Sequence, residues 1–212
     1  MIGKLVLAAL VAGLLAGLIY GGVQHVRTTP LILAAEVYEK AGAPADGWQR
    51  TLSTFVASMI AGAGFAILLA GVSLITGLPI TRGNGVIWGL CGFLAVVVAP
   101  SAGLSPQLPG MPEADLVARQ IWWVATALST GAGLFLIATR AGIYWVAAAL
   151  ILIAVPHIFG APQPLNPETA VPAALASSFV ANSIAASAIL WSLIGTFLGF
   201  AMQKFGKDLY PS

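Results

Sequence analysis

The sequence predicts an all-α integral membrane protein built as a bundle of six hydrophobic helices. Three observations indicate this fold class. Of the 212 residues, 59% are hydrophobic and only 8% are charged, whereas soluble domains carry about 25% charged residues. The mean hydropathy is +0.96. The apolar residues also gather in runs of roughly 20, the helix length that a hydrocarbon core of about 30 Å requires.

Six apolar segments are expected to be the spans of a single transmembrane domain over residues 1–212. The third and fifth are short for a full span, so five spans with a re-entrant third segment remain an alternative. The fourth and fifth are together too long for one span, so a tight turn at Arg140 and Gly142 must divide them. The segments cover about 4–26, 51–76, 84–99, 118–139, 141–156 and 172–203.

The charged residues predict which side of the membrane each connection occupies. Basic residues near helix ends favour the cytoplasm, so we expect both termini there. The residues then placed in the cytoplasm are Lys4, Arg82, Arg140, Lys204, Lys207 and one acid, Asp208. Nearly all carboxylates fall in the outer loops, at Glu36, Glu39, Asp46, Glu113, Asp115 and Glu168.

The connections alternate between short inner turns and long, proline-rich outer loops. The outer loops cover about 27–50, 100–117 and 157–171. A Thr-Arg pair precedes both the third and the fifth segment, at Arg82 and Arg140. These features suggest three helical hairpins that each turn outside the membrane, since transporters are often built from internal repeats. A bundle without a repeat is the alternative.

Helix packing explains most of the remaining motifs. The spacing of Gly13, Gly17 and Gly21, and of Gly195 and Gly199, lets helix backbones approach closely. The net charge of +2 and the lack of a basic tract give no indication of a nucleic-acid partner. The sequence has no nucleotide-binding loop and no zinc-protease motif, and its spans are nearly devoid of ionisable side chains. These absences predict that the chain is not an enzyme.

Two histidines are candidates for metal binding. His25 ends the first apolar segment and His157 ends the fifth, so both would meet the acid-containing outer loops. Imidazole and carboxylate groups are suitable ligands for a divalent first-row metal. Alternatively, each histidine is an interfacial side chain or a helix cap. The carboxylates that would join them are Glu36, Glu113 and Asp115.

Two loop sequences resemble the signature of the CbtA family, which comprises predicted cobalt transporter subunits. The first is GLSPQLPGMPEADLVARQIWW at residues 103–123, and the second is VPHIFGAPQP at residues 155–164. The run PLILAAEVY at residues 30–38 is similar to the family pattern too. The resemblance covers about residues 5–203. Its motif positions are Glu36, Gly110, Asp115, Arg119, His157 and Gln163.

The resemblance implies cobalt uptake across the inner membrane of a bacterium, linked to cobalamin synthesis. It implies a small partner, CbtB, with one membrane helix and a histidine-rich tail; a homo-oligomer is a further hypothesis. The transported cobalt ion is then the substrate, and no permanently bound cofactor is expected. Gln163 joins the candidate metal ligands. A non-transporting membrane scaffold remains the alternative function. The family is described with five spans, whereas the charges favour six.

Overall fold

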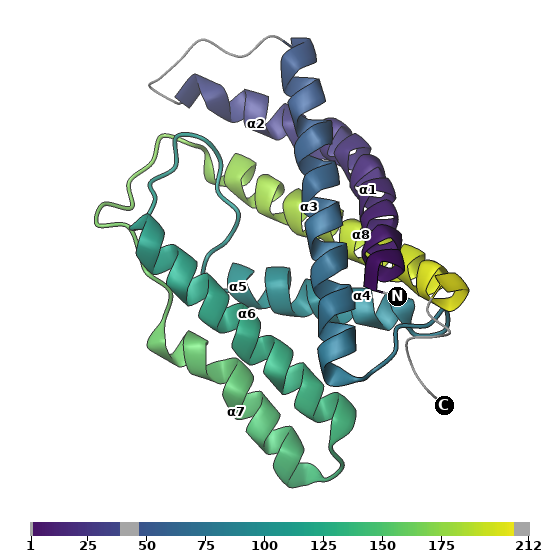
Figure 1. Ribbon diagram of the computed structural model, residues 1–212. Helices are drawn as coiled ribbons and strands as arrows, with labels where there is room; N and C mark the ends of the chain where they lie inside the picture. The colour runs from purple at the N-terminus through teal and green to yellow at the C-terminus, as the bar shows by residue number, and fades with distance from the viewer. Residues whose placement is uncertain (1, 39–46, 206–212) are drawn as a thin grey trace. The chain divides into compact units, whose positions relative to one another are not determined.

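All six predicted apolar segments are helical in the computed structural model, which describes residues 2–38 and 47–205 (Figure 1). Glu39, Lys40, Asp46, Lys207, Asp208 and the side chain of Lys204 lie outside this described part. The elements are α1 (Ile2–Arg27), α2 (Thr29–Ala35), η1 (Glu36–Tyr38), α3 (Gly47–Thr76), α4 (Gly85–Phe93), η2 (Leu94–Val98), α5 (Ala99–Ser101), α6 (Leu116–Thr139), α7 (Ile143–Phe159) and α8 (Ala173–Phe205).

Four of the helices are long and apolar enough to cross a membrane, judged by length and composition. They are Gly3–Arg27, Gly47–Thr76, Leu116–Thr139 and Ala173–Gln203. The other two expected spans, Gly85–Ser101 and Ile143–Phe159, are shorter apolar helices. The 17 residues of α7 rise about 26 Å, slightly less than a hydrocarbon core of about 30 Å. Six spans, and five as the alternative, therefore both stay predictions.

The first predicted outer loop begins with a helix that the sequence analysis did not identify. The α1 helix ends at Arg27, and the hydroxyl of Thr28 donates to the carbonyl of Gln24 at 3.0 Å. The α2 helix then starts at Thr29, with Pro30 in its first turn, where the missing N–H of proline costs nothing. Only seven residues long, α2 is too short to show a periodic pattern in the sequence.

The chain divides into two compact units, and the single domain expected from the sequence stays a prediction. The first unit comprises Met1–Pro30, Gly42–Leu90 and Ala185–Ser212. In it, α1 and α3 run antiparallel with their backbones in contact (Figure 1). A Cβ atom at Gly13 would collide with the backbone of Gly62, and one at Gly17 with the backbone of Ser58. This close approach is what the glycine spacing in the first segment predicted.

A second glycine-lined contact in the first unit joins α4 to the end of α8. Cβ atoms at Gly85 and Gly89 would collide with the carbonyl oxygens of Gly195 and Trp191, respectively. The Trp191 side chain is fully buried and lies against Phe65 of α3, with ring centroids 4.8 Å apart. The α3 and α8 helices therefore meet through aromatic packing, while α4 and α8 meet through their backbones.

The second unit comprises Leu31–Ala41 and Cys91–Ile184. Its α6 and α7 helices form a hairpin (Figure 1). Gly142, with φ of 111°, supplies the backbone conformation that the predicted tight turn needs. The α6 helix also packs on η2 and α5. In η2 the N–H of Ala99 bonds to the carbonyl of Leu94, a widened helical turn.

Three predicted outer loops meet in the second unit around a small apolar core. Each loop contributes one buried residue, namely Ala35, Leu108 and Val171. Side chains that pack against this core are Ile32, Tyr38, Met111, Leu175 and Phe179. The sequence placed these three loops on one side of the membrane, and within this unit their meeting fits that placement.

Candidate metal-loading site

A tight turn shapes the loop that precedes α6. The N–H of Met111 donates to the carbonyl of Leu108 at 3.2 Å, with Pro109 and Gly110 between them. Gly110 has φ of 81°, as the third residue of a type II turn requires, and proline favours the second position. The Gly110 motif position therefore has a backbone explanation.

Two hydrogen bonds hold this loop in place. The side-chain N–H of Gln107 donates to the carbonyl of Pro112 at 3.0 Å. The hydroxyl of Thr169 donates to the carbonyl of Gly110 at 3.3 Å, which ties the third predicted outer loop to the second. Neither Gln107 nor Thr169 stood out in the sequence, because a glutamine or threonine in a loop has no distinctive pattern of its own.

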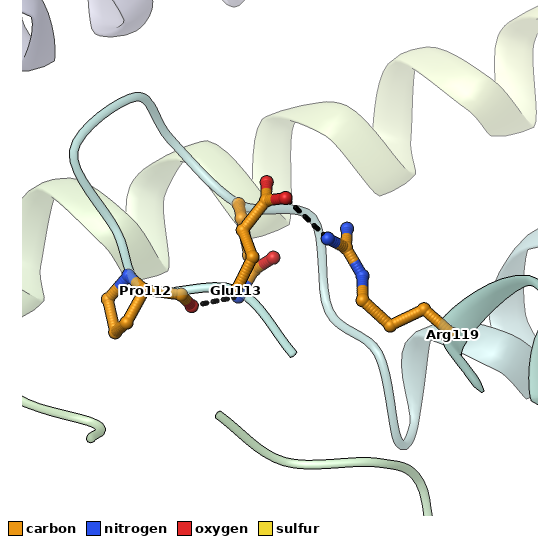
Figure 2. Close-up of polar contacts among 4 residues, drawn as sticks. Pro112, Glu113 and Arg119 are labelled. Atoms are coloured by element: carbon orange, nitrogen blue, oxygen red, sulfur yellow. Dashed lines mark hydrogen bonds and ion pairs between the residues drawn. The ribbon is translucent and has the colours of Figure 1, made fainter. Parts of the chain in front are cut away.

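Both carboxylates of this loop have partners within the second unit. Figure 2 shows Glu113 and Arg119 pointing toward one another, with Arg119 Nη1 and Glu113 Oε2 2.5 Å apart. Asp115 precedes α6, and its Oδ1 accepts from the N–H of Ala118 at 2.9 Å. That bond caps the helix, a role for which aspartate is well suited. Each acid thus has a structural contact alongside its predicted role as a ligand.

Glu113, Asp115 and Gln163 line one surface hollow of about 570 Å³. The side-chain N–H of Gln163 donates to the carbonyl of Ala161 at 3.2 Å, so its amide oxygen is the atom suited to a cation. Asn166 lines the hollow too, and the sequence analysis missed it. Three of the six predicted ligands therefore share one hollow, together with prolines that stiffen its walls.

A larger hollow of about 710 Å³ adjoins this one, because Ala114, Pro162, Gln163 and Pro164 line both. Its remaining walls come from η2, α5, α6 and the loop before α6. The polar side chains among its lining residues are Ser101, Ser105, Gln107, Arg119, Gln120 and Gln163. Among the described residues that line it, Arg119 is the only charged one. Oxygen-rich ligation of a bare metal ion therefore suits the smaller hollow better.

His157 lines neither hollow and packs against an aromatic side chain. Its ring meets Trp122 of α6 edge-on, with centroids 5.6 Å apart. The indole N–H of the buried Trp122 donates to the carbonyl of Pro156 at 3.0 Å, and the N–H of Gly160 bonds to the same carbonyl at 3.1 Å. This carbonyl is therefore already occupied. The role of His157 as a metal ligand stays a prediction.

The other two predicted ligands lie elsewhere. His25 is exposed in the last turn of α1, in the first unit. Glu36 is half-buried at the start of η1, directly after Ala35 of the loop core. Among residues 2–38 and 47–205, no group of three or more histidine, cysteine, aspartate or glutamate side chains is placed to hold a metal ion. Amide and backbone oxygens are the further ligand atoms that the described residues offer.

Comparison with known proteins identifies the protein family of this chain. A family model described as "Probable cobalt transporter subunit (CbtA)" matches residues 2–203, nearly the whole chain. The chain belongs to the CbtA family. The resemblance carried by the loop sequences is thereby confirmed. The comparison with curated proteins gave no match, and the comparison with solved structures gave none either.

Membership of the CbtA family makes this chain a subunit of a probable cobalt transporter. Its apolar helices fit a protein that acts in transport across a membrane. A subunit of a transporter implies a partner, and transporter subunits are not a class of enzymes. The hollow lined by Glu113, Asp115 and Gln163 lies inside the matched residues.

Proposed function

We propose that this CbtA chain is the main membrane subunit of a transporter that takes up cobalt ions for cobalamin synthesis. The observation that carries the proposal is the family match over residues 2–203. The cobalt ion is the substrate, and no permanently bound cofactor is needed. A divalent first-row cation of this kind accepts carboxylate and amide oxygens as well as imidazole.

The hollow of Glu113, Asp115 and Gln163 is the proposed loading site. Two carboxylates within three residues raise the local concentration of cations, and Gln163 lines the same hollow. Ligands in such a site replace part of the water shell of the ion. Three further proposed ligands, His157, His25 and Glu36, do not line this hollow. Substituting each of them individually tests whether it binds the metal.

The membrane, the orientation and the partner complete the proposal. We place the chain in a bacterial inner membrane with both termini in the cytoplasm, in agreement with the distribution of lysine and arginine. The three acid-containing loops then face outward, toward incoming metal. The proposed partner is a small subunit of the CbtB type, with one span and a histidine-rich tail. A homo-oligomer is compatible with this arrangement, and nucleic acid has no part in it.

A non-transporting scaffold is the second candidate function. The glycine-lined contacts of α1 with α3 and of α4 with α8 favour it, because these helices are built for close packing. Among the described residues, charged side chains are also nearly absent from the long apolar helices.

Purified chain in liposomes separates the two functions. We expect labelled cobalt to enter liposomes containing the chain, or the chain with its partner, faster than liposomes without protein. The chain is a scaffold if two results are obtained together. Cobalt does not enter liposomes that contain the chain alone, and it enters liposomes with the partner alone as fast as liposomes with both proteins. The variant Glu113→Gln should slow entry at low cobalt concentration, whereas Glu168→Gln, an exposed loop acid outside both hollows, should not.

A further inference from the structure

An ion pair crosses the boundary between the two hollows of the second unit. Glu113 lines the smaller hollow, and Arg119 lines the larger one. The guanidinium and carboxylate are 2.5 Å apart (Figure 2). The Arg119 side chain is 24% exposed and that of Glu113 is 59% exposed. The pair therefore involves one of the two carboxylates that line the smaller hollow.

The loop does not depend on this ion pair for its shape. Gln107 holds the carbonyl of Pro112, and Asp115 holds the N–H of Ala118, on the two sides of Glu113. Ion pairs this exposed add little to stability, since solvent screens both charges and the side chains lose entropy. A role in function explains the pairing better than a role in folding.

Arg119 occupies the position that a bound metal ion would take beside Glu113. A guanidinium is always charged and has no acceptor atoms, so it cannot itself ligate a cation and repels one that approaches. An incoming ion has to displace Arg119 before it binds the Glu113 carboxylate. This displacement costs every cation the same free energy, namely that of breaking the exposed ion pair, so it lowers the affinity of the site for metal.

We propose that Arg119 is a resident counter-ion of the loading site, which competes with the incoming divalent cation for Glu113 and so lowers the affinity of the site for that cation. This inference rests on the proposed function of the smaller hollow as a loading site. It makes Arg119 a residue that sets the affinity of the site, with an effect opposite in sign to that of a ligand.

A cycle of substitutions tests the competition, with cobalt titrated into the purified full-length chain in detergent. Glu113→Gln should weaken cobalt binding. Arg119→Gln should strengthen it by about two- to five-fold, the range that an exposed ion pair supports. Arg119→Lys keeps the charge and should bind nearly as the unmodified chain does. In the Glu113→Gln background, Arg119→Gln should have a much smaller effect, because no carboxylate is left for the two cations to compete for.

Arg140→Gln is the matched control, because Arg140 lies in the same unit but stacks on Trp145, with 5.4 Å between the guanidinium carbon and the ring centroid. It should leave cobalt affinity unchanged. Unchanged or weaker binding by Arg119→Gln, with normal cobalt flux in the unmodified chain, overturns the inference and leaves the proposed function standing. A Glu113→Gln variant that binds as the unmodified chain does overturns the inference together with the proposed loading site. Absence of cobalt flux in liposomes overturns the proposed function itself.

Discussion

Glycines at the helix contacts of the first unit and in a loop of the second unit serve different purposes. In the first unit, glycines bring helix backbones together, as at Gly13 with Gly62 and at Gly89 with Trp191. In the second unit, the glycine of the predicted outer loop, Gly110, turns the chain so that loop residues surround an open hollow. The first arrangement leaves no space between the helices at the contact, and the second creates space.

This difference indicates where chemistry can take place in the molecule. Backbone contacts between helices offer neither an accessible carboxylate nor room for a hydrated ion. The loops of the second unit offer both, held by hydrogen bonds from Gln107 and Thr169. Functional residues are often found on loops that a rigid scaffold positions. Substitutions at the glycine-lined contacts of the first unit should therefore alter stability, and those in the loops of the second unit should alter metal affinity.

The largest effect is expected at the α1–α3 contact. Gly62→Ala would push a Cβ into the backbone of Gly13, and overpacking of this kind costs about 3 kcal/mol. We expect the melting temperature of the purified protein to fall by roughly 5 to 10 °C. Fluorescence-detected size exclusion after heating measures this change.

Gly64→Ala is the control for that experiment. It lies on the same helix, and an added Cβ would meet nothing within 4 Å. Alanine stabilises a helix relative to glycine by up to about 1 kcal/mol, so this variant should be as stable as the unmodified chain or slightly more so. Equal stability of the two alanine variants would show that the α1–α3 contact is not as close as described.

An effect of intermediate size is expected at His157. Phenylalanine keeps an aromatic ring beside Trp122 but has no ligating nitrogen, so His157→Phe separates packing from metal binding. If His157 is a ligand, as the sequence predicts, cobalt affinity should fall about tenfold or more while the melting temperature changes little. Isothermal titration measures the affinity. Unchanged affinity would leave His157 with its packing role alone.

A smaller effect is expected at the hydrogen bond between Trp122 of α6 and Pro156 of α7. Trp122→Phe removes the indole N–H that donates to the carbonyl of Pro156, and a hydrogen bond of this kind contributes about 1 kcal/mol. The melting temperature should fall by roughly 2 to 4 °C. Trp123→Phe is the control, because Trp123 is 37% exposed. An equal fall in both variants would mean that the Trp122 hydrogen bond contributes nothing specific.

Much of the helical structure could be predicted from the sequence, because long apolar runs specify helices directly. The expected segment 118–139 became Leu116–Thr139, and 141–156 became Ile143–Phe159. The short α2 helix was missed, and so was the widened turn of η2 just before Pro100. Such features depend on local hydrogen bonds rather than on a repeating pattern.

The candidate site could be predicted only in part, for a different physical reason. The distribution of acids along the chain identified Glu113 and Asp115, and the family resemblance added Gln163. Spacing along the chain does not reveal which side chains face one hollow. Arg119 pairs with an acid six residues earlier, outside the separations of three and four that are recognisable on a helix. The glycine spacing at Gly13 and Gly17 predicted close packing, while its partner Gly62 became known only from the fold.

The flux of labelled cobalt into liposomes tests the central claim, namely that metal loads at the loop hollow of the second unit. The initial rate would be measured against cobalt concentration for the unmodified chain, for a combined Glu113→Gln and Gln163→Ala variant, and for Glu168→Gln. We predict that the combined variant needs at least about tenfold more cobalt to reach half its maximal rate. Glu168→Gln should follow the unmodified curve. A combined variant whose curve matches that of the unmodified chain, at equal protein content, would contradict the claim.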